Sequence, residues 1–129
     1  MNISLRLSAI YGLAAVILGA FGAHALKLVL SAEMLQIFHT GVEYQFYHAL
    51  ALLITALLYQ QNPQARLKRA GLFFSIGILL FSGSLYLLSL KEFLAFLPLK
   101  IFGPVTPVGG VFFILGWFSL LTASRKSNA

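Results

Sequence analysis

The sequence predicts an all-α fold, an integral membrane four-helix transmembrane bundle with both termini cytoplasmic. Two observations carry the prediction of the bundle. Of the 129 residues, 60% are hydrophobic and only 9% are charged, whereas a soluble domain carries roughly 25% charged residues. In addition, four stretches are long and apolar enough to cross a bilayer, which takes about 20 helical residues. This composition excludes soluble enzyme folds, nucleic-acid-binding domains and disordered tails.

The four apolar stretches define the predicted spans, at about residues 7–26, 41–60, 70–88 and 107–123. A short basic loop, residues 61–69, separates the second span from the third and contains a proline break. No connection is long enough to hold a second domain. We therefore expect residues 1–129 to form a single membrane domain.

Two features of the first span indicate whether it is cleaved as a signal peptide and how it packs. The beginning of the chain resembles a signal peptide with its cleavage site: a basic residue, Arg6, is followed by an apolar run and then by Ala23-His24-Ala25. The apolar run, residues 7–23, is longer than the usual core of about 7–15 residues, so we expect this span to be retained, with cleavage as the alternative. Ala15, Gly19 and Ala23 recur every four residues, which favours close helix packing over a substrate groove lined by backbone.

Short signals mark three further helix boundaries. Residues 31–38 are expected to form a separate amphipathic helix on the bilayer surface. Residues 89–92 read as a capping box that opens an interfacial segment. Thr106 followed by Pro107 is typical of an N-cap and first helical position, which opens the last span.

The distribution of Lys and Arg predicts the orientation, because cytoplasmic loops carry the excess. With four spans, both termini and the middle loop share one side, which holds six cations: Arg6, Arg66, Lys68, Arg69, Arg125 and Lys126. The opposite side holds three cations: Lys27, Lys91 and Lys100. Both termini are therefore predicted to be cytoplasmic.

Polar groups gather near the first two spans, and ionisable groups within spans are functional-site hypotheses by default. The candidate polar cluster comprises His24, His39, Glu43, Tyr44, Gln45, His48, Ser82 and Ser84. One interpretation is a metal, haem or proton-transfer site at the outer face. On one continuous helix, however, His48 lies about 180° from His39 at 100° per residue. One helix therefore cannot direct both imidazoles at one ion.

A structural interpretation accounts for the same residues. Thr40 and Glu43 have the spacing of a capping box at the start of the second span, and His24 suits a helix C-terminus. His48 lies deep enough to need a hydrogen-bond partner, because an unpaired polar group in lipid costs several kcal/mol. A backbone carbonyl or the hydroxyl of Ser82 or Ser84 would supply it. For His48 the structural and proton-handling roles both stay open.

Several signatures of chemistry are missing from the sequence. There is no cysteine, no glycine-rich phosphate loop and no pair of carboxylates within a span. We therefore assign no catalytic residue, no cofactor and no metal ligand, and expect no nucleic-acid partner. Five aromatic residues either anchor helices at the interface or stack on a quinone or a lipid; they are Tyr11, Tyr44, Tyr47, Tyr86 and Trp117.

Four motifs together resemble one family, the bacterial inner-membrane proteins grouped as domain of unknown function 423, with eukaryotic relatives called transmembrane protein 256-like. The motifs are Leu18-Gly19-Ala20-Phe21-Gly22-Ala23-His24, Thr40-Gly41-Val42-Glu43-Tyr44-Gln45 with His48, Phe81-Ser82-Gly83-Ser84-Leu85-Tyr86, and Thr106-Pro107-Val108-Gly109-Gly110 followed by Gly116-Trp117. The resemblance implies a small four-span plasma-membrane protein whose first span is retained. It implies no activity.

The expected function is that of a non-catalytic membrane protein. It would act through helix–helix association with itself or with a membrane complex, because the chain has small-residue helix faces and very little soluble surface. The alternative is a protein that handles protons, a metal or a small solute through His24, Glu43 and His48. Beyond the lipid bilayer, the sequence identifies neither a partner nor an oligomeric state.

Overall fold

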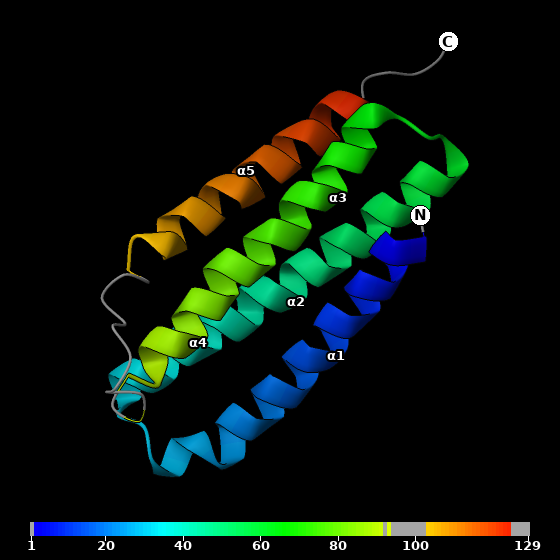
Figure 1. The fold of residues 1–129 in the computed structure, drawn as a ribbon. Helices are drawn as coiled ribbons and strands as arrows, with labels where there is room; N and C mark the ends of the chain where they lie inside the picture. Colours follow the sequence, from blue (N-terminus) through cyan, green and yellow to red (C-terminus); the bar gives the residue numbers. More distant parts are fainter. Residues whose placement is uncertain (1, 92, 94–102, 125–129) are drawn as a thin grey trace.

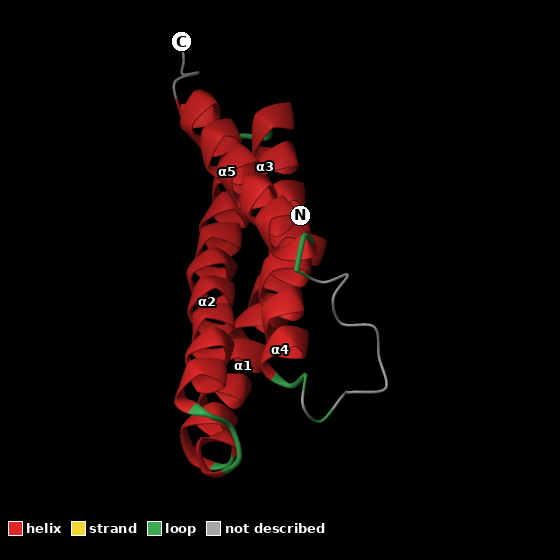
Figure 2. Cartoon of the chain, turned by 90° about the vertical axis from the view of Figure 1, so that its left-hand side faces the viewer, coloured by secondary structure: helices red, strands yellow, loops and turns green. Residues whose placement is uncertain are grey.

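The computed structural model describes residues 2–91, 93 and 103–124 of the chain. Within these residues, four helical segments are long and apolar enough to cross a membrane: Ile3–Leu28, Ala32–Gln61, Ala65–Ser89 and Val105–Ala123. Each contains the whole of one predicted span, so the prediction of an all-α fold with four apolar helices long enough to cross a membrane is confirmed. Helices and their connections account for all the described residues (Figure 2).

The helices follow one another along the chain as α1 (Asn2–His24), the short 3₁₀ turn η1 (Leu26–Leu28), α2 (Ala32–Gln61), α3 (Ala65–Gly77), the π-helical turn η2 (Ile78–Ser82), α4 (Gly83–Ser89) and α5 (Val105–Ser124). α3, η2 and α4 are continuous and together make the third span. α2 and α3 form the centre; α1 packs on α2 and α5 packs on α3, at opposite edges (Figure 1). The start of α1, the end of α5 and the α2–α3 connection lie at one end of the bundle.

The second span begins nine residues earlier than predicted, at Ala32 instead of residue 41. Ser31 is its N-cap, and the Ser31 hydroxyl accepts a hydrogen bond of 3.2 Å from the Met34 amide. The separate amphipathic helix expected over residues 31–38 is therefore wrong, since that segment is the start of α2. Burial explains the extension: Met34 and Phe38 pack against Leu26 of η1 in an apolar cluster that stabilises the added turns.

Two predicted capping boxes are wrong, because α2 starts earlier than predicted and because α4 ends at Ser89. Thr40 lies inside α2 and its hydroxyl donates to the Gln36 carbonyl at 3.0 Å, so Thr40 and Glu43 do not form a capping box. Ser89 is the last residue of α4, and its hydroxyl donates back to the Tyr86 carbonyl at 2.8 Å. Ser89 is thus not an N-cap, while its expected partner Glu92 lies outside the described residues.

The last span starts close to the predicted position. α5 begins at Val105, so Thr106 and Pro107 are already helical, and Thr106 is not the N-cap. The Thr106 hydroxyl instead hydrogen-bonds the hydroxyl of Ser84 on α4. This contact satisfies the Thr106 side chain without a cap and ties the start of α5 to the end of the third span.

Small residues on α1 face α2, as the prediction of close packing requires. Ala15 is 1% exposed, and a Cβ added to Gly19 would lie 3.3 Å from Val42 Cγ1. The strip continues with Gly22, whose added Cβ would lie 2.9 Å from the Phe38 ring, whereas Ala23 is exposed. The third residue of the strip is therefore Gly22 and not the predicted Ala23. The contact moves four residues along α1 from Ala15 to Gly19 and then three residues to Gly22.

Glycines also let α5 approach the third span. A Cβ on Gly116 would lie 2.6 Å from the ring of Phe74, and one on Gly77 would lie 2.5 Å from the ring of Phe113. A Cβ on Gly109 would overlap the backbone nitrogen of Phe81. At all three positions the absent side chain is replaced by a neighbouring phenylalanine residue, which confirms close packing over an open groove at these glycines.

Candidate functional site

His48 lies in the interior of the bundle, on the side of α2 that faces α5. Its side chain is 5% exposed. The Nε1–H of Trp117 donates to His48 Nε2 at 3.0 Å, and His48 Nδ1 lies 2.8 Å from the Tyr44 carbonyl oxygen. An indole nitrogen only donates, so Nε2 must be the acceptor and Nδ1 must carry the proton. Both ring nitrogens are therefore occupied, and the imidazole is neutral.

Aromatic rings enclose the same imidazole. The Phe113 ring stacks on it with centroids 3.6 Å apart and planes 6° from parallel, and the Phe74 ring lies 5.7 Å away. His48 thus joins α2 to both α3 and α5. The predicted backbone carbonyl partner is present, whereas the hydroxyls of Ser82 and Ser84 bind elsewhere.

The two serines brace the third span against its neighbours. Ser82 is fully buried, and its hydroxyl donates to the Gly41 carbonyl of α2 at 2.7 Å. The Ser84 hydroxyl lies 2.9 Å from the Phe81 carbonyl and contacts Thr106 of α5. Ser82 belongs to the π-helical turn η2, so its bond fixes an irregular stretch of the third span to a regular helix.

Gln45 connects three helices from one position on α2. Its side-chain amide donates to the Tyr11 carbonyl of α1 at 2.8 Å. Its carbonyl oxygen accepts from the hydroxyl of Tyr86 on α4 at 2.6 Å. The Tyr11 hydroxyl in turn donates to the Ser75 carbonyl of α3 at 3.1 Å. The whole network consists of satisfied donors and acceptors with no free reactive group.

In the described part of the chain, the side chains of the remaining candidates make no hydrogen bond to another helix. His24 is exposed at the end of α1, with Nδ1 3.0 Å from the Ala20 carbonyl oxygen. His39 packs edge-on against Phe38, and Glu43 is exposed. Tyr44 is 38% exposed and stacks near His48 at 6.0 Å. Among the described residues, no three His, Asp or Glu side chains are grouped closely enough to hold a metal ion.

The aromatic residues that bind His48 and those that belong to the Gln45 network were not identified from the sequence. Trp117, Tyr11 and Tyr86 were assigned to interface anchoring or ligand stacking, yet each makes a hydrogen bond between helices. A usable signal exists in the sequence, because a Trp or Tyr well inside a span needs a polar partner there. This rule identifies Trp and Tyr side chains as hydrogen-bond donors, but it does not identify the helix that supplies the acceptor for each.

Comparison with known proteins gives a consistent result. A family model described as "Protein of unknown function (DUF423)" matches residues 18–110, the range from the first to the fourth motif. The chain is 42% identical to the UPF0382 membrane protein YwdK of Bacillus subtilis, over 98% of both chains. It is 43% identical to a UPF0382 membrane protein of Haemophilus influenzae, over 99% of this chain and 98% of that one.

A further relative carries a location in its name. The chain is 40% identical to the UPF0382 inner membrane protein YgdD of Escherichia coli, over 92% of this chain and 86% of the relative. No solved structure matches the chain significantly. The chain is a multi-pass protein of the bacterial plasma membrane. It belongs to the DUF423 (UPF0382) family of membrane proteins.

Proposed function

We propose that this protein is non-catalytic and acts through lateral association within the bilayer, with a second copy of itself or with a larger membrane complex. The observation that carries the proposal is the closed bonding of the interior. Gln45, His48 and Ser82 each spend their hydrogen-bonding groups on other parts of the chain. No reactive group is left free among them, so we expect a protein partner to bind at the lipid-facing surface.

One part of that surface suits a helix partner. In lipid, apolar side chains gain little by leaving the acyl chains, so association depends on close backbone approach at small residues. A shallow groove of about 150 Å³ runs between α1 and α2 and includes Ser8, Ala9 and Gly12. A Cβ added to Gly12 would meet nothing within 4 Å. The glycines at the α3–α5 contact, in comparison, are already covered from within, which favours the groove as the contact face.

Single-cysteine cross-linking tests the proposal directly, because the chain contains no cysteine. Ala9→Cys places a thiol at the groove, on an exposed position one turn from Gly12, and Ile114→Cys places one on the 67% exposed outer side of α5. We expect oxidation in native membranes to give a disulfide dimer with Ala9→Cys and little dimer with Ile114→Cys. Ala70→Cys, at a position that is 0% exposed, is the control for non-specific oxidation. Monomer alone from both exposed positions, with no adduct after amine cross-linking either, overturns the proposal.

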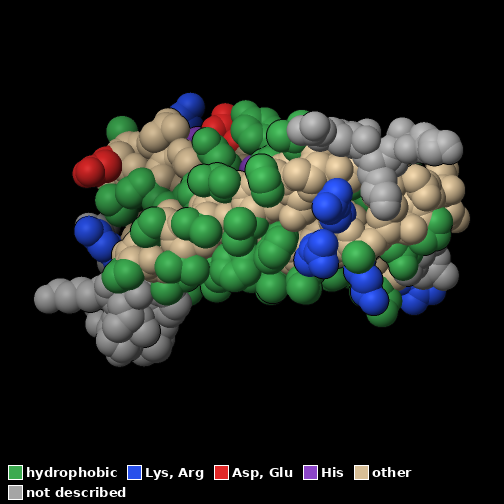
Figure 3. Space-filling model, turned by 90° about the horizontal axis from the view of Figure 1, so that it is seen from above, with side chains coloured by type: hydrophobic (Ala, Val, Ile, Leu, Met, Phe, Trp, Pro, Cys, Tyr) green, Lys and Arg blue, Asp and Glu red, His purple; other side chains and the backbone are tan. Residues whose placement is uncertain are grey.

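We also propose that both termini and the α2–α3 connection face the cytoplasm. In support, the side that shares the termini carries six Lys and Arg against three on the other. Figure 3 shows most of the basic side chains at one end and the acidic ones at the other. In intact cells, a membrane-impermeant maleimide should label Lys27→Cys and spare Asn62→Cys. The reverse pattern contradicts this orientation.

The alternative function, handling of protons, a metal or a small solute through His24, Glu43 and His48, stays a prediction from the sequence. It requires His48 to give up its bond from Trp117 and requires an approach to His24 and Glu43, both of which are exposed. Metal analysis of the purified protein tests it: a stoichiometric metal that is lost in His24→Ala or Glu43→Gln favours this alternative over lateral association alone.

A further inference from the structure

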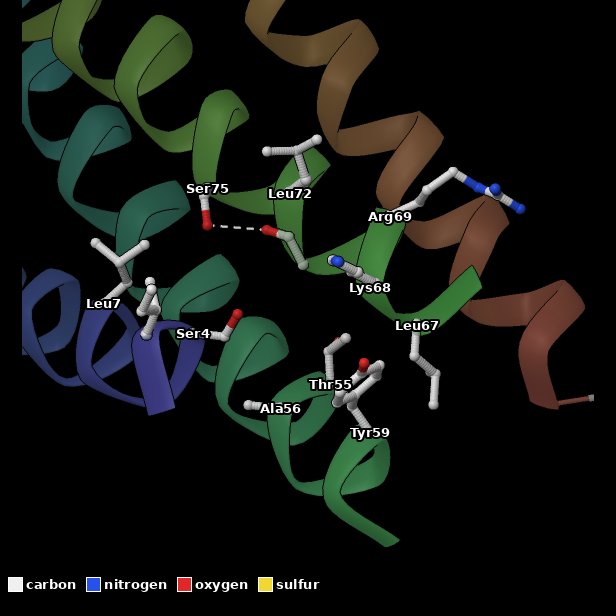
Figure 4. Close-up of a pocket in the computed structure, with 12 residues that line it drawn as sticks. Ser4, Leu7, Thr55, Ala56, Tyr59, Leu67, Lys68, Arg69, Leu72 and Ser75 are labelled. Carbon is white, nitrogen blue, oxygen red and sulfur yellow. Dashed lines mark hydrogen bonds between the residues drawn. The ribbon is translucent and has the colours of Figure 1, made fainter. Parts of the chain in front are cut away.

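A second and larger cavity lies away from the histidines. This pocket of about 580 Å³ is formed by α1, α2 and α3 at the end of the bundle that holds the α2–α3 connection (Figure 4). Its volume lies within the range of about 300–1,000 Å³ that is common for small-molecule sites. The three helices meet here without filling the space, so the sequence has left room for something other than its own side chains.

Three polar side chains that line this pocket can donate hydrogen bonds to a ligand. Ser4, Tyr59 and Lys68 line it from α1, α2 and α3 respectively. Within the part of the chain that the structure describes, the hydroxyls of Ser4 and Tyr59 make no hydrogen bond and the Lys68 ammonium makes no ion pair. In Figure 4 the Lys68 side chain extends over the pocket, whereas the Arg69 side chain turns away toward α5. Two hydroxyls and one ammonium are a donor set that suits phosphate oxygens.

The surrounding charge has the matching sign. Arg6, Arg66 and Arg69 are exposed at the same end of the bundle. The two described carboxylates, Glu33 and Glu43, lie in the first half of α2, which starts at the opposite end. An anion at the pocket would therefore meet positive charge without a competing carboxylate among the described residues.

The pocket also continues below the level of the charged groups. Lys68 lies in the first turn of α3, and Ser75, which also lines the pocket, is seven residues further on, or about 10 Å deeper at 1.5 Å per residue. Leu7 and Leu72 line the space between these levels. A ligand that fills the pocket must therefore be polar and anionic at the membrane surface and apolar beneath it.

We propose that this pocket binds an anionic phospholipid. The Lys68 ammonium pairs with the phosphate, the hydroxyls of Ser4 and Tyr59 donate to its oxygens, and the upper part of an acyl chain lies against Leu7 and Leu72. The apolar depth selects a membrane lipid over a soluble phosphate compound. This binding is independent of lateral association, because a single copy of the chain supplies every contact.

Native mass spectrometry of the detergent-solubilised full-length protein tests the site. The probes are phosphatidylglycerol, zwitterionic phosphatidylcholine and inorganic phosphate, each titrated separately. We expect one phosphatidylglycerol per chain, bound on the order of tenfold more tightly than phosphatidylcholine, and no retained inorganic phosphate. Lys68→Gln should weaken phosphatidylglycerol binding by about tenfold, the loss expected for one charge-assisted hydrogen bond.

Arg6→Gln is the matched control, because it removes one exposed charge from the same end without altering the pocket. It should change the affinity less than twofold. Ser4→Phe, which fills the pocket without changing charge, should also reduce binding. If Lys68→Gln and Arg6→Gln lose the same amount of phosphatidylglycerol affinity, or if the protein binds the two lipids equally well, the proposed site is wrong. Either result would mean that anionic lipids are attracted to the basic surface in general. Retention of inorganic phosphate as tightly as phosphatidylglycerol overturns the assignment of a lipid.

Discussion

The two outer helices are attached to the central pair in different ways. α5 meets the third span at Gly77, Gly109 and Gly116, where an added Cβ would lie within 2.6 Å of a neighbouring atom. On α1 the corresponding contacts are looser: 3.3 Å at Gly19 and 2.9 Å at Gly22, with open space around Gly12. Both pockets described above border α1, and neither is lined by α5.

This difference divides the bundle into a tightly packed part and an adaptable one. α2, the third span and α5 interlock phenylalanines with glycines, and His48 and Trp117 add a polar bond between helices. α1 is held by one strip of small residues and by the contacts of Gln45 and Tyr11. Lipid does not drive apolar surfaces together. The two parts therefore differ mainly in how closely their helix backbones approach each other, and less in the amount of apolar surface that they bury. Lipids and other helices are expected to insert along α1.

The largest expected effect is at the tightest contact. Gly109→Ala forces a methyl group onto the backbone of Phe81, which cannot move away as a flexible side chain would. We expect the free energy of unfolding to fall by about 3 kcal/mol, the upper part of the range for overpacking. Unfolding by SDS in mixed micelles measures it. Gly110→Ala, whose nearest neighbour is 3.9 Å away, should stay within about 0.5 kcal/mol of the wild type; equal losses in both variants contradict the comparison.

A smaller effect is expected at the polar bond between α2 and α5. Trp117→Phe keeps an aromatic ring and removes the donor to His48 Nε2, which leaves a buried acceptor unpaired. We expect a loss of about 1 kcal/mol. A double-mutant cycle with His48→Phe isolates the bond, because the coupling energy vanishes if the two side chains do not interact. A coupling indistinguishable from zero contradicts the bracing role of His48.

A third variant probes the hydrogen bond between Tyr86 of α4 and Gln45 of α2, the residue that also binds α1. Tyr86→Phe removes the hydroxyl that donates to Gln45 and leaves the packing of the ring intact. We expect a loss of roughly 0.6 kcal/mol, the average reported for polar contacts between membrane helices. Tyr44→Phe is the control, since the Tyr44 hydroxyl makes no hydrogen bond within the described chain. If Tyr44→Phe costs as much as Tyr86→Phe, the network around Gln45 contributes nothing specific.

The smallest change in stability is expected at Gly12. Gly12→Ala meets open space, so unfolding should shift by less than about 0.5 kcal/mol. If α1 is the face for association, the same methyl group keeps a partner helix away, and the dimer fraction in cross-linking should fall. Gly83→Ala, which also meets open space but lies on α4, should leave both quantities unchanged. Unchanged dimer in Gly12→Ala places the contact elsewhere.

Hydropathy was sufficient to predict the four spans, because each is a long apolar segment whose signal does not depend on its neighbours. The start of α2 could not be read in this way. Glu33, Gln36 and His39 lower the hydropathy of its first turns, so the predicted span began at residue 41. Those turns are helical because Ser31 caps them and because Met34 and Phe38 are buried by η1 and α1, and contacts of this kind depend on the folded arrangement.

The hydrogen-bond partners of His48 were predicted in part. The sequence indicated that His48 needs a polar partner, and the local one, a backbone carbonyl one turn earlier, is present. The distant partner, Trp117, is 69 residues away along the chain, and its choice over Ser82 or Ser84 depends on how the helices rotate about their axes. The same rotation places Gly22 at the α2 contact in place of Ala23, a difference that spacing alone does not resolve.

α2 has 30 residues, which at 1.5 Å per residue makes it about 45 Å long, against a hydrocarbon thickness of about 30 Å. A straight helix of this length overshoots the acyl layer by about ten residues, and we expect the polar first third, with Glu33 and Gln36, to be the part that emerges. Bilayer thickness therefore bears on this helix directly, since a thinner membrane is met by tilting. Because α2 carries the bonds to every other span, such a tilt would turn the bundle as a whole.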